Sequence, residues 1–329
     1  MKHSIKFISY TFFLAGILVA GAGCKKQDYA LPVAKDVLQN DVIKRTQGPN
    51  IVGQNIEFAY AMAILPSKGK LVSAQVEASI AGAAGTFLEN RSFYTAQTGA
   101  DVGVQIGNAS TTTTTTTVVT FTKDTSAATL RYFYLIPEEA RGKTVTFKFT
   151  VKSSNGETAS YSMGPYTIAK MDMVRLLSVS NNNLAYISIA DMKVYNAADA
   201  AANAAKIDLV YLYRNLTTST FAHALVAPGA DTQYLPGITL PAGVNRNTKE
   251  VKVFNLQDYN LAQLQYGIYI DDLDFQQYNF STAVNYAINV KQESGVWVET
   301  TDAKFRAYIF VNAVNAAGTA TISIKRYAL

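Results

Sequence analysis

Cysteine and histidine are nearly absent from this chain of 329 residues, and their scarcity excludes several kinds of chemistry. Cys24 is the only cysteine, so the chain can form neither an internal disulfide nor a metal site built from several thiolates. The two histidines, His3 and His223, are too few for a multi-histidine metal centre within a folded domain. Stability must therefore come from packing, and a Ser-His-Asp arrangement would have to be built around His223.

Charged residues are also scarce, at 16% of the sequence, and they are not clustered. The formal net charge of +5 falls to +3 without residues 1–23, which carry two lysines and no acidic residue. No run of basic residues after that point is longer than two, as in Lys25-Lys26. A face that binds nucleic acid needs clustered basic residues, so no nucleic-acid partner is expected. Phosphate-binding glycine loops and nucleophile elbows are missing too, and no cofactor is expected.

The first 23 residues have the pattern of a bacterial secretory signal. Lys2 and Lys6 precede an apolar run at residues 12–20, which closes on the small residues Gly21-Ala22-Gly23. An apolar run this short does not span a hydrocarbon core of ~30 Å as a helix, so a permanent transmembrane anchor is not expected. Small residues before Cys24 resemble a bacterial lipobox, in which the cysteine becomes the N-terminus and is acylated. We therefore expect residues 1–23 to be a lipoprotein signal peptide and Cys24 to carry the lipid.

Polar residues and turn formers fill residues 24–50, which predicts a tether between the lipid and the first domain. From Ile56 to Ile64 the pattern changes to strict alternation, and similar short segments recur through residues 51–170. Asn155-Gly156 accepts the positive φ angles of a tight hairpin turn. Many short strands with turn signals between them, and hardly any helical period, favour an immunoglobulin-like β-sandwich over residues 51–170.

Two stretches of this domain do not alternate. Residues 81–100 are rich in glycine and contain several aromatic residues, which predicts a long loop of the kind that often carries function. Residues 110–117 are a serine and seven threonines. A repeat without apolar alternation does not fix a strand register, so a solvated loop or a frayed edge is expected there.

Residues 171–329 are predicted to form a second, β-rich domain with one or two short helices. Strand-like segments recur up to residue 327, and proline-glycine pairs mark the loops between them. The alanine-rich residues 196–206 have the propensity of a helix, with an acidic residue near its start. The fold as a whole is therefore expected to be mostly β.

Exposed aromatic rings are a common means by which a protein without cofactors holds sugars, because a flat ring stacks on the apolar face of a pyranose. Loop aromatics are the candidate ligand contacts: Phe93 and Tyr94 in the first domain, Tyr278 and Phe280 in the second. Trp297 alternates against two flanking valines, and an exposed ring there would make it a fifth candidate. Aromatic rings equally fill cores, so packing within the loops and sheets is the alternative interpretation for all five.

The densest acidic segment contains Asp271, Asp272 and Asp274. Clustered carboxylates suit a hard cation such as calcium, but the glycine and glutamate spacing of a helix-loop-helix calcium site is missing. A carboxylate pair also serves glycoside hydrolysis, and nothing in the sequence pairs these residues with a second carboxylate. A solvated turn is the favoured interpretation, and His223 is expected to be a surface or packed residue.

Three stretches carry a family resemblance: Ile56-Glu57-Phe58-Ala59-Tyr60-Ala61-Met62, Ile136-Pro137-Glu138-Glu139-Ala140-Arg141-Gly142-Lys143-Thr144-Val145 and Gly164-Pro165-Tyr166-Thr167-Ile168. With the lipobox cysteine and the tether, they resemble accessory surface lipoproteins of Bacteroidota nutrient-uptake loci, encoded beside TonB-dependent importers and starch-binding-type partner lipoproteins. The resemblance implies ligand capture, an outer-membrane location and an importer complex as partner. The cell surface is favoured, and the periplasmic face stays open because a lone acid, Asp28, follows Lys25-Lys26-Gln27.

The leading hypothesis is therefore a non-catalytic, lipid-anchored envelope protein that captures a nutrient ligand for an outer-membrane importer. A glycan is the first choice of ligand and a peptide the second. A structural or adhesive surface lipoprotein is the main alternative. A hydrolase that uses carboxylates is the least favoured class, because no second carboxylate is paired with Asp272 in the sequence.

Overall fold

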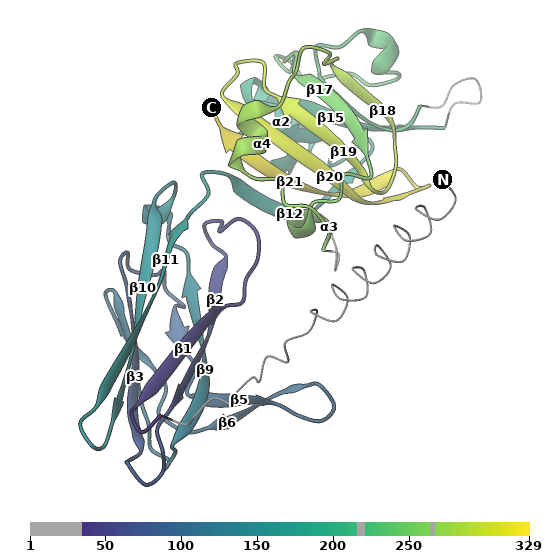
Figure 1. Ribbon diagram of the computed structural model, residues 1–329. Coiled ribbons are helices and arrows are strands. Elements are labelled where there is room, and N and C mark those ends of the chain that lie inside the picture. The colour runs from purple at the N-terminus through teal and green to yellow at the C-terminus, as the bar shows by residue number, and fades with distance from the viewer. Residues whose placement is uncertain (1–34, 216–220, 264–266) are drawn as a thin grey trace, which may run out of the picture. The chain divides into compact units, whose positions relative to one another are not determined.

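The computed structural model describes residues 35–215, 221–263 and 267–329 (Figure 1). The expected signal peptide, Cys24 and the first part of the expected tether lie outside these residues. Among the helices of the described ranges, none is both long and apolar enough to cross a membrane. The expected mostly β fold is confirmed: antiparallel sheets make up two modules, which are described separately below.

The first module is a sandwich of two antiparallel sheets. One sheet has the strand order β1-β2-β9-β4 and the other has the order β11-β10-β3-β8-β7. A separate two-stranded hairpin, β5-β6, extends away from both (Figure 1). The strands are β1 (Gln39–Lys44), β2 (Asn55–Ala63), β3 (Leu71–Ala78), β4 (Phe87–Leu88), β5 (Arg91–Thr95), β6 (Asp101–Gln105), β7 (Thr111–Thr113), β8 (Thr116–Thr120), β9 (Ala127–Leu135), β10 (Thr144–Ser153) and β11 (Thr158–Thr167), with a 3-10 turn at Glu138–Ala140.

Alternation along β2 produces the core of this sandwich. Ile56, Phe58, Tyr60 and Met62 are buried, and the residues between them face outward. Phe58 lies against Phe147 of the opposite sheet, with ring centroids 4.9 Å apart. Burying a side chain of this size contributes about 1.5–3 kcal/mol, so the aromatic core is a main source of stability in a module without cysteine.

Three segments of the first module differ from the sequence expectations. Residues 39–44, within the expected tether, form the edge strand β1, because Val42 is buried beneath the sheet. Residues 81–100 are not one long loop but contain β4 and β5. The threonine run supplies β7 and the start of β8, because β8 pairs with β3 along its length and that pairing fixes a register that the repeat alone does not specify.

The second module contains two five-stranded antiparallel sheets, ordered β12-β21-β20-β19-β17 and β14-β13-β15-β16-β18. Three short α-helices lie within the described residues, one more than expected. The elements are β12 (Asp172–Ser180), β13 (Tyr186–Ser188), β14 (Lys193–Tyr195), α2 (Ala197–Ala202), β15 (Leu209–Arg214), β16 (Ala222–Val226), β17 (Lys249–Phe254), α3 (Tyr259–Ala262), α4 (Asp272–Gln277), β18 (Tyr286–Val290), β19 (Ser294–Glu299), β20 (Phe305–Asn315) and β21 (Thr319–Ala328), with 3-10 turns at Ala204–Lys206 and Thr232–Tyr234.

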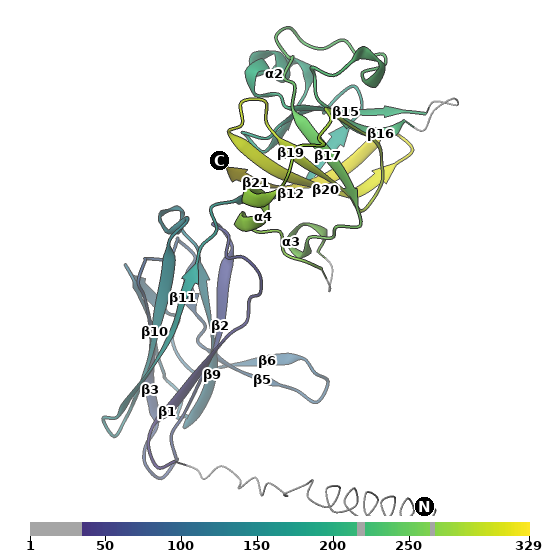
Figure 2. The same cartoon turned by 45° about the horizontal axis from the view of Figure 1, so that its top comes forward.

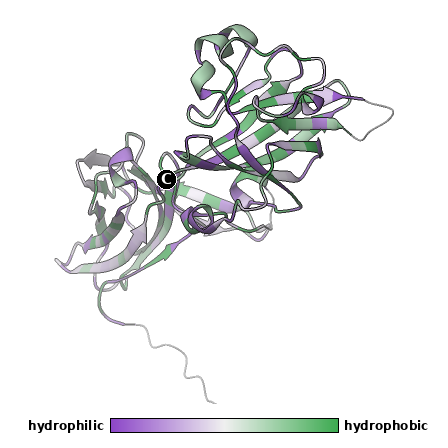
Figure 3. Ribbon diagram, turned by 90° about the horizontal axis from the view of Figure 1, so that it is seen from above, coloured by the Kyte–Doolittle hydropathy of each residue, from purple (hydrophilic) through white to green (hydrophobic). Residues whose placement is uncertain are grey.

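Helices cover the outer faces of these two sheets. Between the sheets lies an aliphatic core that includes Leu209, Val298 and Ile324. The other face of the first sheet packs beneath α3 and α4 in a core rich in aromatic residues, and α2 covers the outer face of the second sheet. Figure 2 shows α2 at one end of the module and α3 and α4 at the other. Hydrophobic residues concentrate along the strands (Figure 3). Both faces of each sheet are therefore buried over much of their area.

Candidate functional site

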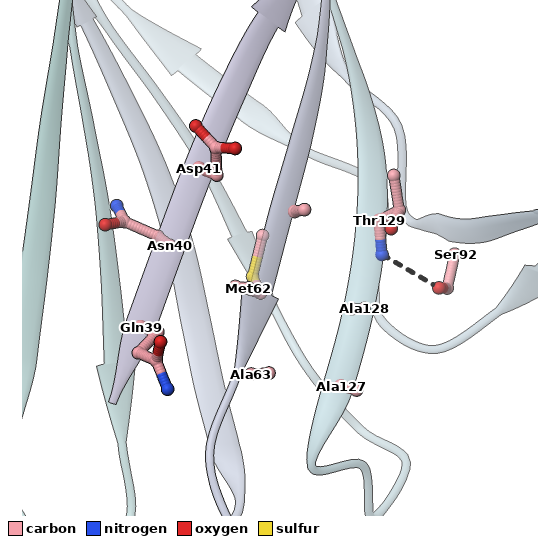
Figure 4. Close-up of a pocket in the computed structure, with 10 residues that line it drawn as sticks. Gln39, Asn40, Asp41, Met62, Ala63, Ser92, Ala127, Ala128 and Thr129 are labelled. Carbon is pink, nitrogen blue, oxygen red and sulfur yellow. Dashed lines mark hydrogen bonds between the residues drawn. The ribbon is translucent and has the colours of Figure 1, made fainter. Parts of the chain in front are cut away.

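A groove of about 380 Å³ lies on the outer face of the first module, beside the β5-β6 hairpin (Figure 4). We call it the hairpin groove. Its residues come from β1, the end of β2, the start of β9 and the base of β5. They are Gln39, Asn40, Asp41, Ala61, Met62, Ala63, Ser92, Ala127, Ala128 and Thr129.

The floor of the hairpin groove is made of small side chains in two cross-strand rows. Strand pairing sets Gln39 opposite Ala63 and Ala63 opposite Ala127 in the first row. In the second row Asp41 lies opposite Ala61, which lies opposite Thr129. Alanine methyl groups fill little space above a sheet, so the middle strand forms a shallow apolar hollow. Amide and carboxylate groups on β1 line one side of it.

The wall of the groove is the β5-β6 hairpin. Ser92, at its base, accepts a hydrogen bond of 3.0 Å from the backbone N–H of Thr129 (Figure 4). Ser92 and Tyr94 share one face of the hairpin because they are two positions apart, and cross-strand pairing places Val104 and Val102 on that same face. Ser92 lines the groove, and Tyr94 and the two valines lie on the same face of the hairpin. Tyr94 is 56% exposed and Val104 is 51% exposed, so this wall presents apolar surface to solvent.

The opposite face of the hairpin is fixed to the sheet by charge. Asp101 lies 2.7 Å from the Arg131 guanidinium and 3.6 Å from that of Arg45. The Thr95 hydroxyl and Arg131 lower the pKa of Asp101, so this carboxylate is charged at neutral pH. The Arg131 guanidinium also lies over the Phe93 ring, 5.5 Å from its centroid. We call the group Arg45, Asp101, Arg131 and Phe93 the hairpin clamp.

The two loop aromatics predicted in the first domain therefore have different environments. Phe93 is half-buried in the hairpin clamp, whereas Tyr94 is exposed on the hairpin face that carries Ser92 and is not among the residues that line the groove. Sequence reasoning missed the floor entirely. The sequence indicates that the alanines of β2 lie on the strand face opposite the apolar residues. It does not indicate that they lie beside Gln39, Asp41 and Thr129, because this depends on strand pairing.

The three aromatic candidates of the second domain pack against one another. Tyr278 stacks on Trp297 with centroids 4.2 Å apart and the rings inclined at 20°, and Phe280 meets Tyr278 at 4.9 Å. The Arg306 guanidinium lies over Phe280 at 5.2 Å. Trp297 is only 4% exposed, so its ring is packed and does not meet the condition under which it would be a fifth ligand contact. It lies on a strand flanked on both sides, and Phe275 of α4 covers its ring.

The acidic segment is the start of helix α4 and not the solvated turn that the sequence favoured. The Asp271 carboxylate accepts hydrogen bonds from the backbone N–H groups of Leu273 and Asp274. In turn, the Asp274 carboxylate accepts a hydrogen bond from the backbone N–H of Asp271. These contacts form a capping box at the start of α4. Asp272 instead accepts from the backbone N–H groups of Lys170 and Met171, at 2.7 and 3.1 Å. Throughout the described ranges, no three His, Cys, Asp or Glu side chains are grouped so as to hold a metal ion.

His223 is a packed residue, within the range expected from the sequence. It is 7% exposed, and its Nδ1 lies 2.7 Å from the hydroxyl of Tyr211. Burial lowers the pKa of His223, so the ring is neutral at pH 7. No carboxylate contact is present at this ring among the described residues, and nothing there resembles a catalytic triad.

The chain matches two family models and several solved structures. Residues 35–168 match the domain of unknown function DUF4466, and residues 169–329 match the domain of unknown function DUF8576. No curated protein matches the chain. The crystal structure of a DUF4466 family protein from Parabacteroides merdae is 49% identical, covers 89% of this chain and 99% of that one, and has a TM-score of 0.84.

Two bacterial surface proteins resemble the chain only weakly. A C-terminal fragment of the major pilin GBS80 of Streptococcus agalactiae is 11% identical, covers 48% of this chain and 66% of its own, and has a TM-score of 0.27. The Actinomyces fimbrial adhesin FimA is 11% identical, covers 88% of this chain and 96% of its own, and has a TM-score of 0.29. Similarity this low carries no functional argument. The Parabacteroides match agrees with the expected likeness to Bacteroidota proteins, and at 49% identity over nearly its whole length it shows that the chain belongs to the DUF4466 family.

Proposed function

We propose that this protein is a non-catalytic, lipid-anchored envelope protein that captures a glycan in the hairpin groove. The observation that carries the proposal is the hollow floor of alanine methyl groups, bordered by Ser92 of the hairpin whose same face carries the exposed ring of Tyr94. A groove of about 380 Å³ lies within the range of roughly 300–1,000 Å³ typical of small-molecule sites.

The groove offers the two kinds of contact that a sugar needs. Tyr94 and the alanine floor suit the apolar faces of a pyranose ring. The amide of Gln39 and the carboxylate of Asp41 lie along the edge of the floor, where they suit hydroxyl groups as hydrogen-bond partners. Asp41 is the one charged residue that lines the groove, so a neutral glycan meets no unfavourable charge.

Capture is favoured over turnover at this site. Glycoside hydrolysis takes two carboxyl groups roughly 5 to 9.5 Å apart, and Asp41 is the single carboxylate of the groove lining. The lipid anchor at Cys24 and the partnership with an outer-membrane importer remain part of the proposal. They rest on the lipobox pattern and on the resemblance to accessory lipoproteins of nutrient-uptake loci.

Affinity electrophoresis of the purified protein in gels that contain starch, xyloglucan or mannan tests the proposal. We expect one of these neutral polysaccharides to retard the wild type and the Tyr94→Ala variant to migrate freely. Tyr161→Ala is the matched control, since Tyr161 is an exposed tyrosine of the same module, on β11, and does not line the groove. If Tyr94→Ala is retarded as strongly as the wild type, the hairpin groove is not the binding site. If immobilised peptides retain the protein and no polysaccharide retards it, the ligand is a peptide.

A further inference from the structure

A lysine is completely buried in the second module. Lys325 lies near the end of β21, an inner strand that pairs with β12 and β20, and its side chain is 0% exposed. Taking an ammonium group out of water costs several kcal/mol unless polar partners replace the lost hydration. The partners of Lys325 are therefore informative about what the group does.

Three oxygen atoms surround the Nζ atom of Lys325. It lies 2.6 Å from Oδ2 of Asp258, 2.8 Å from the carbonyl oxygen of Ile270 and 3.0 Å from Oδ1 of Asn260. Asp258 and Asn260 belong to the first turn of α3, and Asp258 is itself fully buried. Backbone N–H groups of Leu261 and Ile270 hold the Asp258 carboxylate in place.

This arrangement brings together an amine, a primary amide and a carboxylate in a site sheltered from water. Burial lowers the pKa of Lys325, which raises the fraction of neutral, nucleophilic amine. Tyr308, which is 0% exposed, and Phe275 belong to the aromatic core on this face of the sheet. Asn260 is only half-buried, so a small leaving group has a route to solvent.

We propose that Lys325 and Asn260 become joined by an amide bond within the folded module, with release of ammonia. Asp258 first takes a proton from the ammonium group and leaves a neutral amine. The Nζ lone pair then attacks Cγ of Asn260, so that an N–C bond forms as the Cγ–Nδ2 bond breaks. Nζ gives up two protons in all: one completes the departing ammonia, and the other stays on Asp258 or leaves with the ammonia as ammonium. No oxidant or reductant is needed.

The bond would fasten α3 to the sheet. This helix has only four residues, and a helix so short has little stability of its own. A covalent link from Asn260 to Lys325 closes a loop of more than sixty residues between two positions that already touch. Such a closure reduces the freedom of the unfolded chain and resists local opening of the helix. The proposal is independent of the hairpin groove.

Peptide mapping of the denatured, trypsin-digested protein by mass spectrometry tests the link. We expect the peptides that contain Asn260 and Lys325 to appear joined, at a mass lower than their sum by one ammonia, with cleavage after Lys325 blocked. Asn260→Ala retains the Lys325–Asp258 ion pair, so it should fold and give free peptides. Asn183→Ala, at an exposed turn, is the matched control and should retain the link.

Two results would overturn the proposal. Quantitative recovery of both free peptides from the wild type would show that Lys325 is a permanently hydrogen-bonded ammonium. A link that persists in Asn260→Ala would show that another residue is the partner.

Discussion

The hydroxyl oxygen of Ser92 accepts a hydrogen bond from the backbone N–H of Thr129, which lies 37 positions further along the chain. This contact joins the base of the β5-β6 hairpin to the first residues of β9. It creates a corner between a sheet and a hairpin, and the hairpin groove lies in that corner. On the other face of the hairpin, Arg131 and Asp101 hold the wall in place. The proposed binding site therefore depends on both sets of contacts.

Arg131→Met tests the hairpin clamp. Loss of the guanidinium removes the ion pair with Asp101 and the contact with Phe93, so the wall that carries Tyr94 is no longer fixed. We expect glycan affinity to fall several-fold, whereas the thermal unfolding midpoint changes little, because an ion pair with one partner in solvent contributes little to stability. Titration calorimetry and a thermal melt measure the two quantities. A large loss of stability with unchanged affinity would show that the clamp serves only the fold.

Glu250→Gln tests a buried acid of the second module. Glu250 is 0% exposed, and burial raises its pKa well above the usual value, against a smaller opposing effect of the backbone N–H of Ala227. The folded state therefore favours the protonated form. The contribution of protonated Glu250 to the free energy of unfolding is fully present below about pH 4.3, the pKa of a glutamate in the unfolded chain. It is lost as the pH rises toward the raised pKa of Glu250 in the folded protein. We expect the variant to be more stable than the wild type at pH 8 and the difference to shrink at pH 4. Parallel urea denaturation curves that show no such pH dependence would contradict this assignment.

Trp297→Ala tests whether the aromatic cluster of the second module is structural. Trp297 is 4% exposed and packs against Tyr278, Phe275 and Tyr308. Truncation of a buried aromatic side chain costs about 3–5 kcal/mol, because the transfer free energy is lost and a cavity remains. We expect a loss of this size in chemical denaturation and no change in glycan affinity for the folded protein. If Trp297→Ala binds the glycan more weakly but is as stable as the wild type, Trp297 is a ligand contact.

Removal of divalent cations tests the acidic segment. The carboxylates of Asp271 and Asp274 bind backbone N–H groups at the start of α4, and that of Asp272 binds those of Lys170 and Met171. We expect EDTA and added calcium to leave the unfolding midpoint unchanged, and Asp272→Ala to lower stability by about 0.5–1.5 kcal/mol, because two backbone N–H groups lose their acceptor. A rise in the midpoint with calcium that disappears in Asp272→Ala would establish a metal site.

The sequence predicted the parts of the fold that depend on local pattern. Alternation from Ile56 to Met62 indicated a strand with one buried face, and that face is buried. The loop expected at residues 81–100 contains two strands instead, because Phe87 and Leu88 pair with the distant residues Phe133 and Tyr132. Such pairing leaves no periodic signal in a segment of two to five residues.

The candidate site was predictable only in part, for the same physical reason. Tyr94 was selected as an aromatic residue of an expected loop, and the structure places it on β5. The floor was not, since Asp41, Ala61 and Thr129 become neighbours only through the register of three strands. Trp297 illustrates the opposite case. Its alternation with valine does not show that α4 covers the face of the sheet that carries Trp297, while Val296 and Val298 pack between the two sheets.

The most direct test of the binding account fills the floor of the hairpin groove. Ala61 is exposed at the centre of the floor, and a large ring at this position occupies the space assigned to the ligand without disturbing the core. We expect Ala61→Trp to unfold at the same temperature as the wild type and to lose retardation by the polysaccharide that binds the wild type in affinity electrophoresis. Undiminished retardation of folded Ala61→Trp would contradict the account.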